Sequence, residues 1–246
     1  MKTKIITMLL AILSLTATAQ DVQFLYDLGH SLYNDIPNRS SVTTTFEMFK
    51  PDKWGSTFTF MDINYQSDGV AGAYMEFARE FNLTANKQWA AHIEYNGGLT
   101  SDRETWDATR FQHAVLLGGA WNWHNPNFSK TFSFQAMYKY YFKNKHWGLS
   151  GFNGFQITEV WGINFADNLC TFSGFCDLWY DPTVKGHLIL LSQPQFWVNL
   201  NQMKGMKDVN LSLGSEVEFS NNFIWNNKGQ HNKFYTIPSL AAKWTF

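Results

Sequence analysis

The chain has few charged residues, and its apolar residues are not gathered into long runs. Asp, Glu, Lys and Arg make up 16% of its 246 residues, whereas typical soluble domains contain about 25%. Beyond residues 5–15, no apolar stretch approaches the roughly 20 residues that a transmembrane helix needs. The formal net charge of −1 predicts no basic surface, which argues against nucleic acid as a partner. These absences argue against a helical membrane protein and disfavour an ordinary soluble domain.

Cysteine is also scarce, with only Cys170 and Cys176 in "LCTFSGFCDLWYD". If this stretch is one strand, both side chains point to the same face, about 20 Å apart at about 3.3 Å per residue, which is beyond disulfide reach. A hairpin here would instead let the two cysteines pair. We favour the strand and free thiols. No His or third Cys lies nearby, so we expect no metal site.

The N-terminal stretch "MKTKIITMLLAILSLTATAQD" has the pattern of a secretory signal peptide. Lys2 and Lys4 precede the apolar run, and Ala17 and Ala19 follow it at the A-x-A spacing. We expect residues 1–19 to be the signal peptide and residues 20–246 to form one barrel domain. The alternative is an N-terminal membrane anchor, for which the apolar run is too short.

Aromatic residues are abundant, at 17%, with 22 Phe, 11 Trp and 10 Tyr. Apolar and polar residues alternate along most of the chain, as in "TFSFQAMYKYYF", "VNLSLGSEVEFS" and "KQWAAHIEYN". This period of two indicates strands, and no stretch shows a convincing helical period. Low charge, many aromatics and dispersed apolar residues are together typical of outer-membrane β-barrels.

Clusters of Pro, Gly, Asn, Asp and Lys divide this alternating pattern into strands. We predict an all-β fold, an antiparallel transmembrane β-barrel of about 12 strands, because the strands are long enough to cross a bilayer at a tilt. The predicted strands are 22–32, 40–50, 54–65, 72–83, 87–99, 108–121, 130–142, 146–157, 168–180, 187–200, 208–220 and 234–246.

The last predicted strand, "YTIPSLAAKWTF", is expected to close the barrel by pairing with the first, because backbone groups in lipid must be satisfied within the protein. Its predicted outward residues are Leu240, Ala242, Trp244 and Phe246, and its predicted inward residues are Ala241, Lys243 and Thr245. Pro238 is expected at the start of the strand or at an irregular edge. The alternative is a secreted soluble β-protein that ends in Phe.

Four blocks resemble the nucleoside-specific channel-forming outer-membrane protein (Tsx) family. They are Trp54–Leu83, Thr171–Asp181, Pro194–Gln202 and Leu211–Phe246, whereas the middle third, residues 87–168, has no match. The resemblance implies a narrow monomeric barrel of twelve strands with weak nucleoside sites in its lumen. It also implies that Phe246, at the end of an amphipathic strand, is the signal read by the outer-membrane assembly machinery.

The inward residues of the matching strands follow from strand parity if charged residues face the lumen. We expect aromatic side chains there to stack on a nucleobase, and carboxylates and amides to bond its ribose and base edges. The candidate solute-binding residues are Phe58, Phe60, Asp62, Asn64, Tyr74, Glu76, Phe175, Asp177, Trp179, Gln195, Trp197, Asn199, Glu216 and Glu218. For each carboxylate the alternative is a structural pair with Arg79, Arg110, Lys139 or Lys243.

The sequence therefore predicts a channel in the bacterial outer membrane for passive uptake of small polar solutes, with nucleosides the best guess. Its expected partners are membrane lipid, the solute and the assembly machinery, and we expect a monomer without a cofactor. A structural or adhesion barrel with a filled lumen is the first alternative. A barrel enzyme acting on lipid is the second, but the seven His are dispersed, so we expect no catalytic or metal residues.

Overall fold

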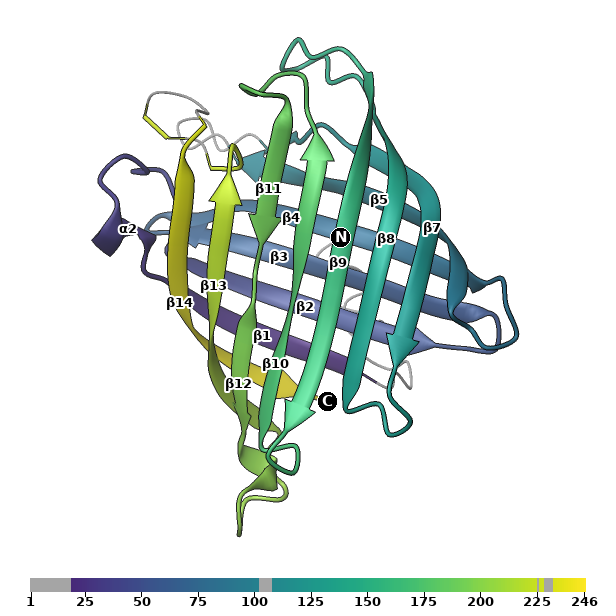
Figure 1. Ribbon diagram of the computed structural model, residues 1–246. Coiled ribbons are helices and arrows are strands. Elements are labelled where there is room, and N and C mark those ends of the chain that lie inside the picture. Colours follow the sequence, from purple (N-terminus) through teal and green to yellow (C-terminus); the bar gives the residue numbers. More distant parts are fainter. Residues whose placement is uncertain (1–18, 102–107, 225, 228–231) are drawn as a thin grey trace, which may run out of the picture.

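The computed structural model describes residues 19–101, 108–224, 226–227 and 232–246, and in this part the chain is a closed antiparallel β-barrel (Figure 1). The predicted signal peptide, residues 1–19, lies outside the described residues except for Ala19. The strands are β1 Ala19–Asp27, β2 Val42–Pro51, β3 Gly55–Gln66, β4 Gly69–Asn82, β5 Trp89–Ser101, β6 Ala108–Arg110, β7 Ala114–His124, β8 Lys130–Tyr141, β9 Phe152–Phe165, β10 Cys170–Tyr180, β11 Leu188–Ser192, β12 Gln195–Asn199, β13 Leu211–Asn221 and β14 Phe234–Thr245.

These segments occupy twelve positions around the ring, because two positions each hold two segments. β6 and β7 both pair with β5, and β11 and β12 both lie between β10 and β13. The second break falls at Pro194, which has no N–H for the ladder, although its carbonyl still accepts from the Val217 N–H at 3.0 Å. The predicted fold class is confirmed, and the predicted strands 108–121 and 187–200 each correspond to one such interrupted position.

The ring closes where β14 pairs with β1, from Asp21 opposite Thr245 to Asp27 opposite Ser239. Pro238 lies inside β14, so its predicted place at the start of the strand is wrong, whereas the predicted alternative, an edge, fits its position opposite the end of β1. The Pro238 carbonyl accepts a hydrogen bond from the N–H of Leu28, the first residue after β1. The N–H that proline lacks would therefore lie beside the point where β1 leaves the sheet. The proline therefore removes no bond from the β1–β14 ladder.

Two predicted strand positions differ from the structure. The strand expected at 22–32 ends at Asp27, because the Asp27 carboxylate accepts from the Gly29 N–H at 2.7 Å and a short helix, α2 Gly29–Leu32, follows. The strand expected at 146–157 is β9, which begins later. Residues 142–151 form a separate connection, in which an isolated bridge between Asn144 and Leu149 encloses a turn.

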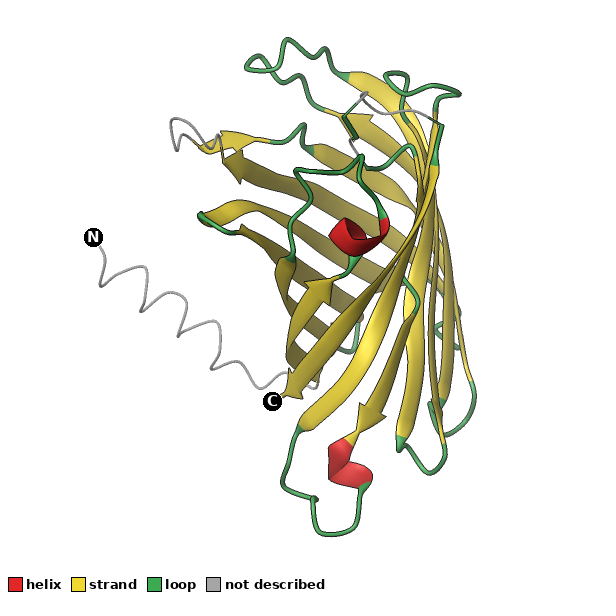
Figure 2. Cartoon of the chain, turned by 90° about the vertical axis from the view of Figure 1, so that its left-hand side faces the viewer, coloured by secondary structure: helices red, strands yellow, loops and turns green. Residues whose placement is uncertain are grey.

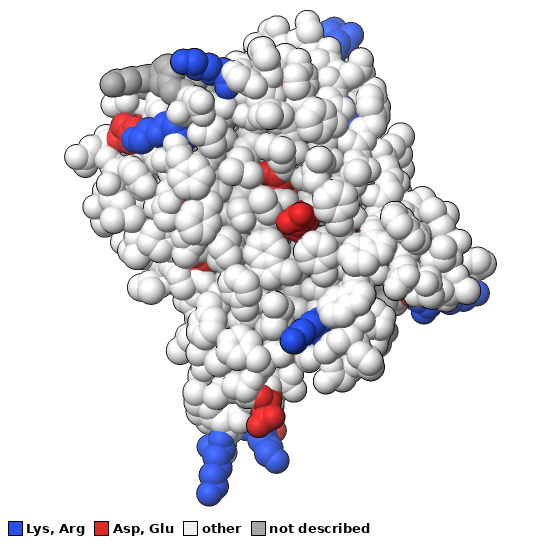
Figure 3. Space-filling view, viewed as in Figure 1, with Lys and Arg blue, Asp and Glu red and all other residues white. Residues whose placement is uncertain are grey.

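The outer wall of the barrel is apolar. Side chains on the outward parity are largely exposed, with Leu240 at 62% and Phe24 at 55%. Figure 3 shows this wall over β8 to β13, where charged groups are sparse. Glu159 is an exception, since it faces outward on β9 beside Phe134 and Cys176 and is exposed. Cys170 and Cys176 are both free and share the outward face of β10, as predicted.

The two ends of the barrel differ in their connections. One end carries the termini and the turns 52–54, 83–88, 125–129 and 166–169, together with residues 200–210, which include the 3-10 helix η1 Leu200–Gln202. We call it the terminal rim. The other end, the loop rim, carries the connections 28–41, 67–68, 142–151 and 181–187, together with residues 111–113 and the described residues between β13 and β14. Figure 2 shows α2 among the connections of the loop rim and η1 at the opposite end.

In the described part of the chain, no helix is both long and apolar enough to cross a bilayer.

We predict that Leu240→Arg lowers the free energy of unfolding by about 2–4 kcal/mol, because Leu240 faces outward at the middle of β14. Phe234→Arg, on the same outward face but at the end of the strand, should cost about 0–1 kcal/mol, because charge is tolerated near the interface. Denaturant unfolding of the barrel in lipid vesicles measures both. If both variants lost the same free energy of unfolding, Leu240 would not lie at the middle of a membrane-embedded wall.

Candidate lumenal site

The inner face of the barrel is acidic. Strand pairing places these carboxylates on the inward parity: Asp21, Asp27, Glu47, Asp62, Glu76, Glu80, Glu94, Asp177, Glu216 and Glu218. Among the described strand residues, Lys139 and Lys243 are the inward lysines, and His92 lies between Glu80 and Glu94. Inward acids therefore far outnumber inward bases in the described strands.

Strand β3 is accessible from inside the barrel along its length. Its inward residues run from Ser56 to Asn64, about 26 Å at about 3.3 Å per residue, and all of them are only half-buried. Strands β2 and β4 cover the edges of β3, so this exposure is toward the lumen. Water-sized space thus contacts this wall from near one rim to near the other.

The candidate residues on β3 and β4 form one continuous group. The Phe58 and Phe60 rings lie 5.9 Å apart, and Phe60 lies 5.9 Å from Tyr74, so these three rings form an aromatic patch. Beside the patch, Asp62 accepts from Thr45 at 2.5 Å, and the Tyr74 hydroxyl donates to Glu76 at 2.6 Å. Stacking surface and hydrogen-bonding oxygens are therefore adjacent on this wall, and their role as a solute site stays a prediction. Asn64, farther along the strand, accepts from Thr43 at 2.9 Å.

The candidates on β10 face the lumen from another wall. Asp177 accepts from Thr158 at 2.6 Å, and the Trp179 ring lies 5.2 Å from the ammonium of Lys139. Phe175 has the same inward parity.

The candidates on β12 and β13 are engaged with neighbouring side chains. Gln195 donates to Glu216 at 2.8 Å and accepts from the Trp197 indole at 3.0 Å. Trp197 is 0% exposed, and the Lys243 ammonium lies 4.4 Å from its ring. A fully buried ring offers no face to a solute, so the geometry removes Trp197 from the stacking candidates and gives it a packing role.

Asn199 and Glu218, the remaining candidates, are also held by neighbours. Asn199 donates to Thr171 at 3.0 Å and accepts from Ser212 at 2.8 Å. Glu218 is an ion-pair partner of Arg39. The alternative of structural carboxylate pairs therefore fits Glu218, although its partner comes from a connection that the sequence did not indicate. Arg79 pairs instead with Asp52 on the terminal rim.

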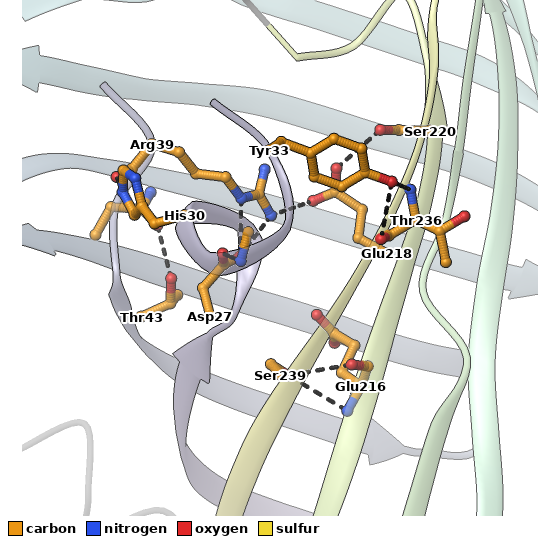
Figure 4. Close-up of polar contacts among 12 residues, drawn as sticks. Asp27, His30, Tyr33, Arg39, Thr43, Glu216, Glu218, Ser220, Thr236 and Ser239 are labelled. Carbon is orange, nitrogen blue, oxygen red and sulfur yellow. Dashed lines mark hydrogen bonds and ion pairs between the residues drawn. The ribbon is translucent and has the colours of Figure 1, made fainter. Parts of the chain in front are cut away.

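The segment of residues 28–41, here called the mouth segment, folds against the inner wall at the loop rim. Ile36 is 1% exposed and packs against Ile224, Tyr235 and Ile237, of which Tyr235 and Ile237 have the inward parity of β14. The Tyr33 hydroxyl bonds both the carbonyl and the N–H of Thr236, as Figure 4 shows. The mouth segment thus narrows the lumen at this end.

Arg39 fixes the mouth segment to two inward carboxylates (Figure 4). Its guanidinium lies 2.7 Å from Asp27 and 2.9 Å from Glu218, and Glu218 also accepts from Ser220 at 2.9 Å. Burial lowers the pKa of Arg39, but the Glu218 and Asp27 carboxylates raise the pKa more, so it lies above its ordinary value. Arg39 therefore stays charged and neutralises part of the acidic lumen.

The other half of the lumen is packed. Leu116, Met137 and Tyr141 form a buried cluster inside β7 and β8. Lys139 donates to Gln156 at 2.7 Å, and its ammonium lies 5.1 Å from the Tyr141 ring. The open track and the packed half therefore lie on different walls of the same barrel.

Two buried oxygens in this packed half have no hydrogen-bond partner among the described residues. They are Glu94 Oε1 and Asn96 Oδ1, both on the inward face of β5 and each in a residue at most 7% exposed. Free acceptors of this kind suit a solute that carries hydrogen-bond donors. Parity could have identified both residues, but the prediction used only the strands that matched the Tsx family.

The geometry defines a closed outer-membrane-type β-barrel with an acidic, partly open lumen. The chain belongs to the DUF5020 family, described as a domain of unknown function, which matches residues 19–246. This family match does not support the resemblance to the Tsx family in particular. A search of curated proteins gave no match.

Two solved structures superpose on the chain. The NanC porin superposes with a TM-score of 0.58 at 10% identity, over 93% of this chain and 100% of that one. LpxR from Salmonella typhimurium has a TM-score of 0.48 at 8% identity, over 93% of this chain and 100% of that one. At these identities the likeness to the NanC porin shows the fold alone.

We predict that Arg39→Gln releases the mouth segment, because Asp27 and Glu218 then lose their cationic partner while remaining close together. Amide hydrogen exchange of residues 29–37 should rise at least tenfold in detergent-solubilised protein, with exchange in β3 unchanged. Lys233→Gln is the matched control, since Lys233 pairs with Asp35 at the exposed edge of the same segment. If the control raised exchange as much as Arg39→Gln, Arg39 would not be the main attachment.

Proposed function

We propose that the protein is a passive outer-membrane channel for small polar solutes that are neutral or cationic, with nucleosides as the best candidates. The observation that carries the proposal is the row of half-buried inward side chains on β3, which extends between the two rims. A channel needs a continuous wall that solvent reaches, together with contacts weak enough to release the solute. The acidic inner face disfavours anions because like charges repel at close range.

The nucleoside assignment rests on the aromatic patch and its neighbours. Base stacking on an aromatic ring is worth about 1–3 kcal/mol in single-strand binding proteins. Phe58, Phe60 and Tyr74 offer such rings within reach of the carboxylates of Asp62 and Glu76, which can accept from ribose hydroxyls. Glucose carries hydroxyls but no base, and adenosine monophosphate carries a charge that the lumen disfavours. These two solutes therefore separate stacking from charge selection.

The structural barrel with a filled lumen is the second candidate, and the packed half of the lumen favours it. Leu116 and Trp197 are each 0% exposed on inward positions. If the mouth segment and this packing leave no continuous passage, the folded barrel will carry no current.

We predict a cation-selective current when the purified barrel is inserted in a planar bilayer. Under a KCl gradient the reversal potential should have the sign of K⁺ permeation, because inward carboxylates attract cations. The double variant Asp62→Asn/Glu76→Gln should move the reversal potential toward zero. Asp208→Asn, which changes the connection after η1 and not the inner wall, should leave the reversal potential unchanged. Anion selectivity, or no current from a folded inserted barrel, would overturn the channel proposal in this form.

We predict that adenosine reduces this current saturably, whereas glucose and adenosine monophosphate have at least tenfold weaker effects. Phe60→Ala should weaken the adenosine effect about fivefold or more, which corresponds to about 1 kcal/mol of lost stacking. Phe77→Ala is the matched control, because Phe77 lies on β4 but faces outward and is 48% exposed. Equal effects of the two variants would exclude the aromatic patch as the solute site.

A further inference from the structure

A cavity of about 530 Å³ opens at the loop rim, where residues 110–113 meet residues 142–151. It is lined by Tyr95, Arg110, Phe111, His113, Tyr140, Phe142, Lys143 and Gly151. We call it the rim pocket. Its volume lies in the range of about 300–1,000 Å³ that is typical of small-molecule sites.

The rim pocket lies mainly on the outer wall, although one lining residue, Phe111, has its ring 6.5 Å from the lumenal Tyr74. Tyr95 pairs with outward Phe77, and Tyr140 pairs with outward Val115, so both tyrosines have the outward parity. Phe142, two residues after Tyr140, is 43% exposed. A molecule in the pocket would therefore contact the barrel from the lipid side.

The lining of the pocket combines aromatic rings with positive charge. The side chains of Arg110 and Lys143 are exposed, and none of the lining residues is acidic. His113 adds an imidazole, which bonds the Tyr95 hydroxyl through Nδ1 at 2.6 Å. Arg and Lys at one opening favour an anionic group, and arginine can bind phosphate through two parallel hydrogen bonds.

The backbone around the pocket is fixed by side-chain bonds between its two segments. Asn144 donates to the Arg110 carbonyl at 2.8 Å, and the Trp147 indole donates to the same oxygen at 3.2 Å. Gln112 donates to the carbonyls of Phe142 at 3.0 Å and Ser150 at 2.8 Å. These bonds hold Arg110 and Lys143, which lie on different segments of the chain, at the opening of the same pocket.

Glycine and ring packing set the shape of the pocket. A Cβ at Gly151 would lie 3.1 Å from the Tyr140 hydroxyl and 2.8 Å from the Tyr141 carbonyl, so a larger residue would fill this side. Tyr140 and Phe142 meet edge to face at 5.3 Å. These rings offer an apolar surface directly beside the two cationic groups.

We propose that the rim pocket binds the phosphate-bearing headgroup of a lipid in the surrounding membrane, with its acyl chains against Tyr140 and Phe142. Charge and location support a lipid over a soluble anion, because the pocket has cationic groups and opens on the outward wall at the loop rim, where β8 ends and β7 begins. In our proposal this rim lies at the membrane–water interface. Aromatic residues concentrate at this interface in membrane proteins. Longer connections mark the outer side of such barrels, so the lipid belongs to the outer leaflet. The inference does not depend on the channel proposal.

We predict that the detergent-solubilised protein binds lipid A with two phosphates, measured by native mass spectrometry over a concentration series. The double variant Arg110→Gln/Lys143→Gln should lower the apparent affinity at least tenfold. Lys204→Gln/Lys207→Gln is the matched control, because it removes two lysines from the connection after β12 at the terminal rim and should leave the affinity unchanged. Heat-dependent migration of the folded barrel in gels checks that each variant is folded.

Two further measurements decide the source of the phosphate and the role of the rings. Dephosphorylated lipid A should bind at least tenfold more weakly, and inorganic phosphate at a hundredfold molar excess should not displace lipid A. Tyr140→Ala should weaken lipid A binding at least threefold without changing the preference for phosphate. The proposal would be overturned by equal binding of the wild type and the Arg110/Lys143 variant, by equal binding of dephosphorylated lipid A, or by full displacement with inorganic phosphate.

Discussion

The satisfaction of backbone hydrogen bonds inside a bilayer is the constraint on which this structure depends. A sheet in lipid cannot leave an edge unpaired, because each buried N–H or C=O without a partner costs several kcal/mol. The β1–β14 ladder removes both edges at once and holds Asp27 opposite Ser239. At Pro194, where the strand position is interrupted, and at Pro238, which lies opposite the end of β1, the proline carbonyls remain bonded. The prolines therefore alter the ring without opening it.

Closure also sorts the side chains. Since one parity of each strand must face lipid, most charge on the strands is directed inward, where it has to be solvated or paired. Five charged strand residues have the outward parity instead: Lys50, Arg79, Arg110, Lys130 and Glu159. The lumen accommodates its carboxylates in different ways. Glu218 is paired with Arg39 of the mouth segment, Asp62 and Asp177 accept from threonines, and Glu94 retains an oxygen without a partner in the described chain. Among the described strand residues, the lumen therefore carries more acids than bases.

The interior has two regions with different physical character. The wall formed by β2, β3 and β4 is half-buried and carries the aromatic patch, whereas the wall formed by β5, β7 and β8 is packed around Leu116 and Lys139. Under the channel proposal, the half-buried wall would supply weak, local contacts to a small solute. The mouth segment adds a second restriction at the loop rim through Ile36 and Arg39. The outer wall has its own feature in the rim pocket, where cationic groups and rings face the lipid.

Alternation in the sequence was enough to predict the all-β fold, the twelve positions in the ring and the faces of Asp62, Glu76 and Trp244, because the period of two is a local property of each strand. It could not place the start of β9 or the end of β1. Those boundaries depend on Asn144 pairing with Leu149 and on Asp27 bonding Gly29 and Arg39. It also could not show that Trp197 is buried under Lys243, that Arg39 enters the lumen, or that Arg110 and Lys143 share one opening. Parity gives the side of the sheet on which a residue lies, but its partners come from strands and connections distant in the chain, and only the closed barrel brings them together.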